Sequence, residues 1–442
     1  MALTPLQQRG HCTKYQRISF HGQGSSSPRR AHAVRVPRHA GATAGGEREG
    51  EAPLLDAPWV ATPPVQQVFL NETVTGDEFA VVVKRLKESL AAALALYLPL
   101  AGNLDYVEEN RQRHRLVVDC SQPGVAFFET VAGSMEVACL LPQHDARVLP
   151  APVMAVQATR LSAGMALGVS VHHAAGDGRS VVLFLEAWSS IACGGSWSSP
   201  VAVTKSLAPS HYAREAITVS HPGSDELAGD VLSKIAPKLP LANTYTTECY
   251  FSQHTRLARQ TMVLGAADIR ALKRRIDGLA PPPPPPAKPV STFVAPSALC
   301  WTAFVQAKGL GAGDDTHLLF QVDLCARLRP PVGARYVGNC VRGCIASADD
   351  GELLGAAGLL RAARAVQAAV AEAVVAPLAG VGKWVQRLMG LPVARQLVVA
   401  GSPLFRMHHL ADFGFGMPEG HRDGVPFEEL QEQGFEEVEQ QQ

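Results

Sequence analysis

The sequence predicts an α/β protein with mixed sheets flanked by helices. Every second residue from 165 to 171 is large and apolar, which is the period of a strand with one buried face. Residues 79–97 carry apolar side chains at the spacing of one helix face. Strand-like and helix-like segments alternate from residue 63 to residue 400, and such alternation indicates α/β layers.

The composition is that of an ordinary globular protein. The 442 residues are 47% hydrophobic and 18% charged, enough for two domains with sizeable cores. The formal net charge is zero, so electrostatics favour neither a nucleic acid nor a membrane surface as partner. No apolar run reaches membrane-spanning length without a charge or a proline. Nine scattered cysteines without a CxxC pair predict reduced thiols, no metal site and a cytoplasmic location.

The first 53 residues differ from the rest of the chain. They are rich in Arg, His, Gly and Ser, and they contain no convincing strand. We expect residues 1–53 to be a disordered or atypical N-terminal extension, with a targeting segment as the alternative.

Residues 54–193 have the elements expected of a first domain. Strands are predicted at 65–70, 116–120, 125–130, 153–160 and 165–172. Pro99 ends the helix over 79–97, and a second, mostly buried helix starts at residue 178.

Residues 194–230 are predicted to be a crossover linker, because their first part is rich in Ser, Gly and Pro. The region 231–416 then forms a second domain. Its predicted strands lie at 260–264, 318–324 and 396–400, and the last of these is expected to be buried. Its predicted helices lie at 266–276, from 291 onward and at 353–375. Six prolines at 281–286 predict a stiff surface loop, with a ligand for a proline-recognition module as the alternative. Residues 417–442 form an acidic divergent tail with little apolar periodicity.

The segment 171–178, VHHAAGDG, is the strongest candidate for chemistry. It follows a strand and precedes a helix, and Asp177 stands where a side chain caps a first helical turn. His173 stands where the strand ends, and histidine is the side chain best suited to take a proton near neutral pH. The spacing alone leaves two alternatives open. His173 could be a core histidine beside a helix cap, or His173 and Asp177 could be metal ligands, although no third ligand has convincing spacing.

Four segments in order resemble the plant BAHD acyl-CoA-dependent acyltransferases. Residues 173–178 are similar to the signature HxxxDG of that family, and residues 412–416, DFGFG, are similar to DFGWG. Residues 336–340, YVGNC, and 400–405, AGSPLF, resemble segments typical of the branch of anthocyanin and phenolic-glucoside malonyltransferases. The resemblance covers residues 54 to 416.

The resemblance implies a two-domain fold like that of chloramphenicol acetyltransferase, with an active-site channel between the domains. His173 would be the general base. Asp177 would face away from the reacting atoms and pair with an arginine of the family pattern DxRxR. The first arginine of that pattern falls on Cys325 here, which leaves Arg327 as the candidate partner.

The second signature implies supporting roles. Asp412, the aspartate of that signature, is carried over with the catalytic set, although we interpret it as architectural. Gly414 and Gly416 would allow special backbone angles in a turn that supports the coenzyme A channel, and Ser402 is a further candidate for coenzyme A binding. Arg179 is a candidate partner for a carboxylate on the acyl group.

The resemblance implies transfer of a malonyl group from malonyl-CoA to a hydroxyl of a glycosylated phenolic, such as an anthocyanin or flavonoid glucoside. Acyl-CoA would be a co-substrate, with no permanently bound cofactor, and we expect a monomer. A hydroxycinnamoyl or other aromatic acyl donor is one alternative. The other is a catalytically impaired paralogue that acts as a binding protein, because Cys325 and both termini depart from the family pattern.

Overall fold

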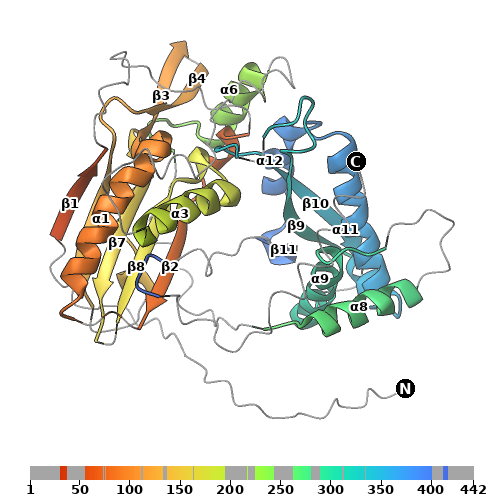
Figure 1. Cartoon of the computed structure of the whole chain (residues 1–442). Helices are drawn as coiled ribbons and strands as arrows, with labels where there is room; N and C mark the ends of the chain where they lie inside the picture. Colours follow the sequence, from red (N-terminus) through yellow and green to blue (C-terminus); the bar gives the residue numbers. More distant parts are fainter. Residues whose placement is uncertain are drawn as a thin grey trace.

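The structure is a computed structural model. It describes residues 30–36, 55–194 (except 73, 75, 111–112, 133–136 and 163), 217, 224–242, 262–279, 289–400 (except 311–312 and 334) and 412–416. Within these residues the chain forms three sheets and a set of covering helices, so the predicted mixed α/β architecture is confirmed (Figure 1). No helix in the described ranges is long and apolar enough to cross a membrane.

The first half is built on a five-stranded sheet of order β1-β5-β7-β8-β2. Its strands are β1 Arg30–Arg35, β2 Val65–Asn71, β5 Gly124–Val131, β7 Met154–Arg160 and β8 Met165–Val171. Strands β5 and β7 are parallel, and the other pairs are antiparallel. Helices α1 Phe79–Leu96 and α3 Gly178–Cys193 lie side by side over this sheet (Figure 1). The Trp188 indole on α3 donates to the Ser89 hydroxyl on α1 at 3.0 Å.

Two predictions for this half need correction. A strand is present within the first 53 residues, since β1 pairs with β5 from Arg30 to Arg35. Its short alternation in a polar, basic stretch gives too weak a sequence signal. Strand β8 is buried on both faces instead of one. Its second face holds small residues, and a Cβ on Gly168 would lie 2.2 Å from the Leu140 carbonyl oxygen, so a covering segment packs directly on the backbone.

A second sheet of order β4-β3-β6 adjoins this half. It contains β3 Asn103–Asn110, β4 Arg113–Asp119 and β6 Ala151–Pro152. The short helix α2 Val137–Leu140 packs on β7 and β8, and α6 Ser224–Ile235 packs on β4. The 3-10 turns η1 Ala57–Trp59, η2 Leu98–Ala101 and η3 His173–Ala175 connect these elements.

The second half has a sheet of order β10-β9-β11, made of β9 Asp315–Asp323, β10 Val341–Asp349 and β11 Gln396–Val398. Helices α9 Val294–Lys308 and α11 Gly358–Val375 pack on one another and on this sheet, with α8 Ala266–Gly278 beside them (Figure 1). The short helix α10 Asp350–Leu354 contacts both α9 and α11. Helix α12 Val381–Met389 packs on β10 and α6, and η4 Val393–Arg395 precedes β11.

The second half also corrects the sequence analysis. The long helix predicted over 353–375 is two helices, interrupted at Gly355, and a Cβ on Gly358 would meet the Leu353 carbonyl oxygen at 1.8 Å. Strand β11 is a partly exposed edge strand instead of a buried one, with Val398 64% exposed. Residues 262–264 are not a strand, and the rest of that predicted strand lies outside the described residues. The proline run, most of the linker and the tail lie outside them too.

Candidate active site

The motif HAAGDG begins where β8 ends. Val171 closes the strand, His173 opens the turn η3, and Asp177 is the N-cap of α3. The Asp177 carboxylate accepts from the Ser180 backbone N–H at 3.0 Å, so the predicted cap is confirmed. The same carboxylate also accepts from the Cys340 backbone N–H at 3.0 Å. Asp177 therefore fixes the start of α3 and joins it to a segment more than 160 residues further along the chain.

Residues 336–340 of the second half surround this turn. The Gly338 N–H donates to the Ser180 hydroxyl at 3.0 Å, and the Asp177 N–H donates to the Gly338 carbonyl at 3.4 Å. The Asn339 side-chain amide donates to the His173 carbonyl oxygen at 2.9 Å. Gly338 has a φ of 152°, which only glycine adopts readily. The segment that resembles a branch marker in the sequence thus holds the histidine turn in place.

The His173 ring lies where the two halves meet. Trp59 stacks on it, with ring centroids 4.1 Å apart and planes 9° from parallel, and Trp384 of α12 lies 5.9 Å from Trp59. His173 is partly exposed, whereas the neighbouring His172 is fully buried. The His172 Nδ1 accepts from the Ala174 N–H at 3.2 Å, which is the behaviour of a structural core histidine.

Burial lowers the pKa of His173, while its own carbonyl, the Asn339 side chain and the Asp56 charge act in the opposite direction. A lowered pKa keeps the imidazole neutral at pH 7, which is the form that can accept a proton. Burial raises the pKa of Asp177, opposed by the hydrogen bonds from Cys340 and Ser180. The arrangement can therefore supply a neutral base on a turn fixed by a buried carboxyl group.

No arginine pairs with Asp177 among the contacts described for these residues. Arg327 donates to the Asp323 main-chain carbonyl instead, so its predicted pairing with Asp177 is not seen. Arg179, predicted as a carboxylate partner, forms an ion pair with Asp323 at 3.0 Å. The side chain at 325 is a buried cysteine, too small and too apolar to provide the guanidinium of the family pattern. Neutral N–H and O–H donors satisfy Asp177 in its place.

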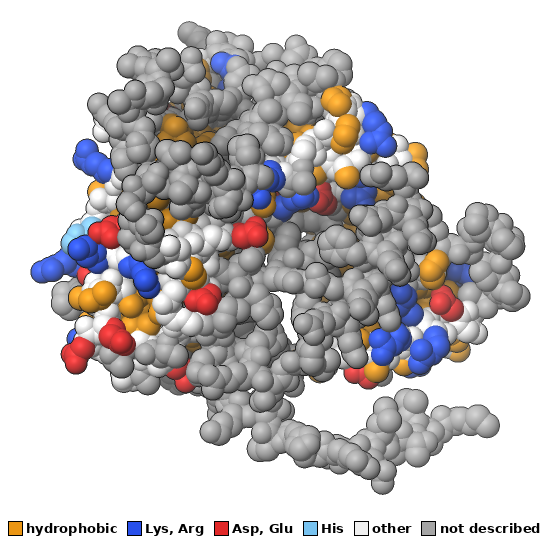
Figure 2. All heavy atoms as spheres, in the orientation of Figure 1, with side chains coloured by type: hydrophobic (Ala, Val, Ile, Leu, Met, Phe, Trp, Pro, Cys, Tyr) orange, Lys and Arg blue, Asp and Glu red, His pale blue; other side chains and the backbone are white. Residues whose placement is uncertain are grey.

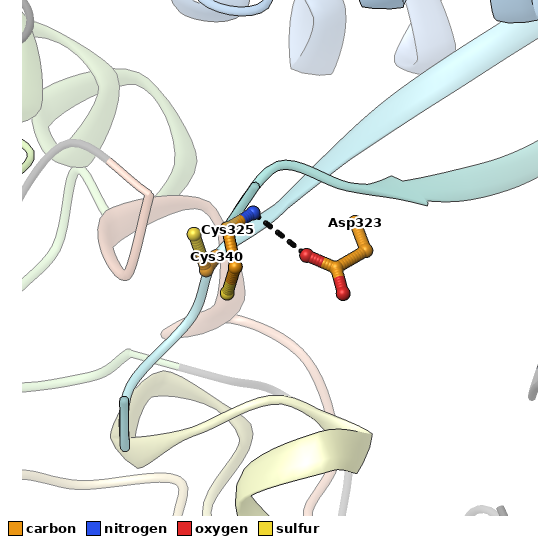
Figure 3. Close-up of side chains that lie close together, drawn as sticks. All are labelled: Asp323, Cys325 and Cys340. Atoms are coloured by element: carbon orange, nitrogen blue, oxygen red, sulfur yellow. Dashed lines mark hydrogen bonds between the residues drawn. The ribbon is translucent and has the colours of Figure 1, made fainter. Parts of the chain in front are cut away.

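Cys325 lies beside Cys340 and Asp323, with ligand atoms within 4.8 Å of one another (Figure 3). One Asp323 oxygen accepts from the Cys325 N–H at 2.7 Å, and the other is held by Arg179. The Cys325 thiol and burial raise the pKa of Cys340. A metal would need thiolates and a free carboxylate, so this cluster does not fit a metal site.

The contacts described for the turn of residues 412–416 are with the first half. The Asp412 carboxylate accepts from the N–H groups of Gly414 and Gly416, at 3.0 and 3.2 Å, and both glycines have positive φ, 84° and 97°. The Asn71 side chain of β2 donates to the carbonyls of Phe415 and Gly416. Asp412 thus stabilises its own turn, and the described residues show no contact between Asp412 and His173. Ser402 lies outside the described residues.

Sequence reasoning missed Asp56, Trp59 and the role of Asn339. Asp56 is fully buried and accepts from both the backbone N–H and the side-chain amide of Asn339. The sequence carries no clear signal for Asp56, because aspartate is usually exposed and its burial here depends on the distant Asn339.

Comparison with known proteins identifies the family. Residues 60–426 match the Transferase family, which is most of the chain. The chain belongs to the BAHD family of acyl-CoA-dependent acyltransferases. The family resemblance of the signature motifs is thereby confirmed.

Three relatives illustrate how similar the sequences are. Phenolic glucoside malonyltransferase 2 of Arabidopsis thaliana is 28% identical over 307 residues, covering 65% of this BAHD chain and 65% of that protein. Phenolic glucoside malonyltransferase 1 of Bemisia tabaci is 30% identical over 327 residues, covering 70% and 69%. An anthocyanin 5-O-glucoside malonyltransferase of Salvia splendens is 28% identical over 391 residues, covering 82% and 79%. The chain thus spans just under two-thirds of the Arabidopsis protein.

Solved structures support the fold. Vinorine synthase matches with a TM-score of 0.58 and 17% identity, covering 88% of this chain and 86% of that one. TRI101 of F. graminearum, solved with coenzyme A and T-2 mycotoxin, matches with a TM-score of 0.55 and 13% identity, covering 84% and 87%. The chain therefore has the chloramphenicol-acetyltransferase-like fold that the resemblance predicts.

Proposed function

We propose that this BAHD chain transfers an acyl group from acyl-CoA to a hydroxyl of a small acceptor, with His173 as general base. The observation that carries this proposal is the partly exposed imidazole of His173, held at the meeting point of the two halves by contacts on several sides. An alcohol is a poor nucleophile until a base takes its proton during attack.

In the proposed reaction His173 removes the proton of the acceptor hydroxyl as its oxygen attacks the thioester carbonyl. The tetrahedral intermediate then collapses, the bond from carbon to sulfur breaks, and the proton on His173 passes to the departing thiolate. The acceptor itself attacks, so no acyl-enzyme is required. General base catalysis typically contributes about 10²–10⁴-fold, and the orientation of two bound substrates contributes much of the remainder.

For the donor we propose malonyl-CoA, and for the acceptor a glycosylated phenolic such as an anthocyanin or flavonoid glucoside. Support comes from the relatives, which are phenolic glucoside and anthocyanin malonyltransferases, and from residues 336–340. An aromatic donor is the second candidate, because a coumaroyltransferase of Arabidopsis thaliana that acts on anthocyanidin 3-O-glucosides is 26% identical over 405 residues. We propose a cytoplasmic monomer with the two domains at 54–193 and 231–416.

Purified protein offered malonyl-CoA, acetyl-CoA or coumaroyl-CoA with a panel of phenolic glucosides tests these proposals, with thiol release and product mass as readouts. We expect turnover with malonyl-CoA, and a loss of about 10²–10⁴-fold in His173→Ala. His32→Ala is the matched control, because His32 lies on β1, separated from β8 by β5 and β7. Turnover with coumaroyl-CoA but not with malonyl-CoA would show that the donor is an aromatic acyl-CoA instead of malonyl-CoA. No turnover from folded protein with any pair would refute the activity.

A further inference from the structure

A buried carboxylate and a buried amide lie directly behind the His173 turn. Asp56 and Asn339 are both 0% exposed. The Asn339 side-chain nitrogen donates to Asp56 Oδ1 at 2.8 Å and to the His173 carbonyl oxygen at 2.9 Å. The Asn339 backbone N–H donates to the same Asp56 oxygen at 2.9 Å. Neither Asp56 nor Asn339 has a role in the proton transfer described above.

These contacts fix which way the Asn339 amide faces. Its two N–H donors are taken by two oxygen acceptors, and a flipped amide would place its own oxygen against a carboxylate and a carbonyl. The amide oxygen Oδ1 must therefore point elsewhere. That oxygen is buried and has no partner, and His173 Nδ1 is likewise buried and has no partner. An unused acceptor and an unused ring nitrogen thus belong to the same cluster.

The amide influences the imidazole in the direction expected of an acceptor. Burial is the largest influence on the pKa of His173 and lowers it. The carbonyl of His173 itself, the Asn339 side chain and the Asp56 charge act against burial, so each of them favours a proton on the ring. Hydrogen bonds at catalytic groups are often long without substrate and shorten when it binds. An acceptor facing Nδ1 selects the tautomer that carries its proton there and leaves the Nε2 lone pair free.

Trp59 restrains the same ring from one face. Trp59 is 7% exposed, and it ends the turn η1 whose N-cap is Asp56. Rotation of the imidazole about its χ2 angle would require the stacked indole to move. One short turn therefore supplies both the carboxylate that orients Asn339 and the ring that covers His173.

We propose that Asp56, Asn339 and Trp59 are positioning residues that hold His173 with its proton on Nδ1 and with Nε2 as the base. Asp56 orients the amide, the amide oxygen accepts from Nδ1–H, and Trp59 fixes the plane of the ring. The negative charge of Asp56 also stabilises the imidazolium that forms during attack. This inference rests on the proposed acyl transfer for its kinetic consequences, but the tautomer of the ring does not depend on any substrate.

The first test is the nitrogen NMR spectrum of histidine-labelled protein, with the His173 signals assigned by their loss in His173→Gln. We expect the Nδ1–H tautomer in the wild type and a mixed or Nε2–H form in Asn339→Ala. Asn71→Ala is the matched control, since Asn71 is also buried and its amide also bonds to main-chain carbonyls. The control is expected to be less stable but to keep the wild-type His173 signals. An Nε2–H tautomer in the wild type overturns the proposal even if transfer occurs.

The second test is kinetic. Asp56→Asn keeps one acceptor oxygen for Asn339, removes the charge and turns the second carboxylate oxygen into an amide nitrogen. It is the variant of choice should Asn339→Ala fail to fold. Misplacement of a catalytic group costs up to about 10²-fold, and we expect kcat to fall within that range in both variants, with KM for acyl-CoA within about twofold. In Asp56→Asn the acid limb of the kcat/KM profile should move to lower pH, because a group that raises the pKa of His173 is gone. A profile that stays in place, with kcat unchanged, contradicts the role of Asp56. If the wild type transfers no acyl group but shows the expected tautomer, the proposed function fails and the positioning of His173 stands.

Discussion

His172 and His173 are neighbours in sequence and opposite in environment. The motif predicts His173 as the base, and the alternative is that His173 is a core histidine. The structure places His172 in the core instead, where its Nδ1 accepts from the Ala174 N–H. The predicted cap at Asp177 is confirmed because capping depends on a few adjacent backbone groups. The partners Cys340 and Asn339 could not be predicted, since their contacts depend on how distant segments pack.

At this scale we predict that acid weakens the fold through His172. Burial lowers its pKa to about 3, from 6.5. The unfolded chain therefore binds a proton near pH 6.5, whereas the folded chain binds it only near pH 3. The stabilising contribution of neutral His172 is complete above pH 6.5 and is lost as the pH falls towards 3, by about 1.4 kcal/mol per pH unit within that window.

Urea unfolding of the wild type and of His172→Asn checks this prediction when it is measured from about pH 4 to about pH 7.5, which covers most of that window. Asn can still accept from the Ala174 N–H, so the variant removes the titration and keeps the hydrogen bond. We expect a shallower dependence of stability on pH in the variant. If the free energy of unfolding falls equally with pH in the two proteins, a group other than His172 causes the loss of stability in acid.

At the scale of elements, most long segments with clear periodicity are confirmed, including α1, α3, α8, α9 and β7 to β9. Prediction is weaker where packing overrides the local pattern. Residues 353–375 look like one helix because alanine favours helix throughout, but the close approach of Gly358 to Leu353 breaks it into two. Strand β1 is not predicted from the sequence, because a short edge strand in a polar stretch depends on its partner β5 for its structure.

The loop 336–340 leads to the second prediction. Gly338 has a φ of 152°, and a Cβ there would lie 2.5 Å from the Tyr336 hydroxyl oxygen. Gly338→Ala should cost about 1–3 kcal/mol of stability in backbone strain, with further loss from the clash, and should lower kcat because the loop binds the His173 turn. Chemical denaturation and steady-state kinetics measure the two effects.

Gly309→Ala is the matched control for this prediction. Gly309 also has a positive φ, 57°, but nothing lies within 4 Å of its added Cβ, and it ends α9 in the other half of the molecule. We expect a loss of about 1 kcal/mol and unchanged kcat. Equal loss of kcat in both variants would mean that Gly338 acts only through overall stability.

At the scale of the whole molecule, the two halves are not independent units. The main core belongs to the first half, yet it includes Val337 and Phe413 from late in the chain. A third cluster joins Leu55 and Ala57 to residues of the second half. On the face drawn in Figure 2, Lys and Arg side chains lie among Asp and Glu side chains, in keeping with zero net charge. The family resemblance predicts the two-domain fold, but periodicity alone could not predict which late segment enters the first core.

Phe413 gives the third prediction. It is 0% exposed and packs against Trp188 of α3 at a centroid distance of 4.8 Å. Phe413→Ala should destabilise the protein by about 3–5 kcal/mol, because a buried ring leaves a cavity. Since the ring lies in the core of the first half, hydrogen exchange should rise in α1 and α3 more than in α9 and α11. Phe413→Leu should show the same pattern with a smaller loss, and an increase confined to residues 396–416 would contradict this account.

The indole of Trp59 has a consequence for stereochemistry. An imidazole lone pair lies in the plane of its ring, so covering one face of His173 leaves the basic nitrogen usable while excluding molecules from that side. In the proposed reaction the acceptor oxygen would then approach along the edge of the ring. The rest of the acceptor would have to extend away from the indole, which would restrict the hydroxyl groups that can reach the base.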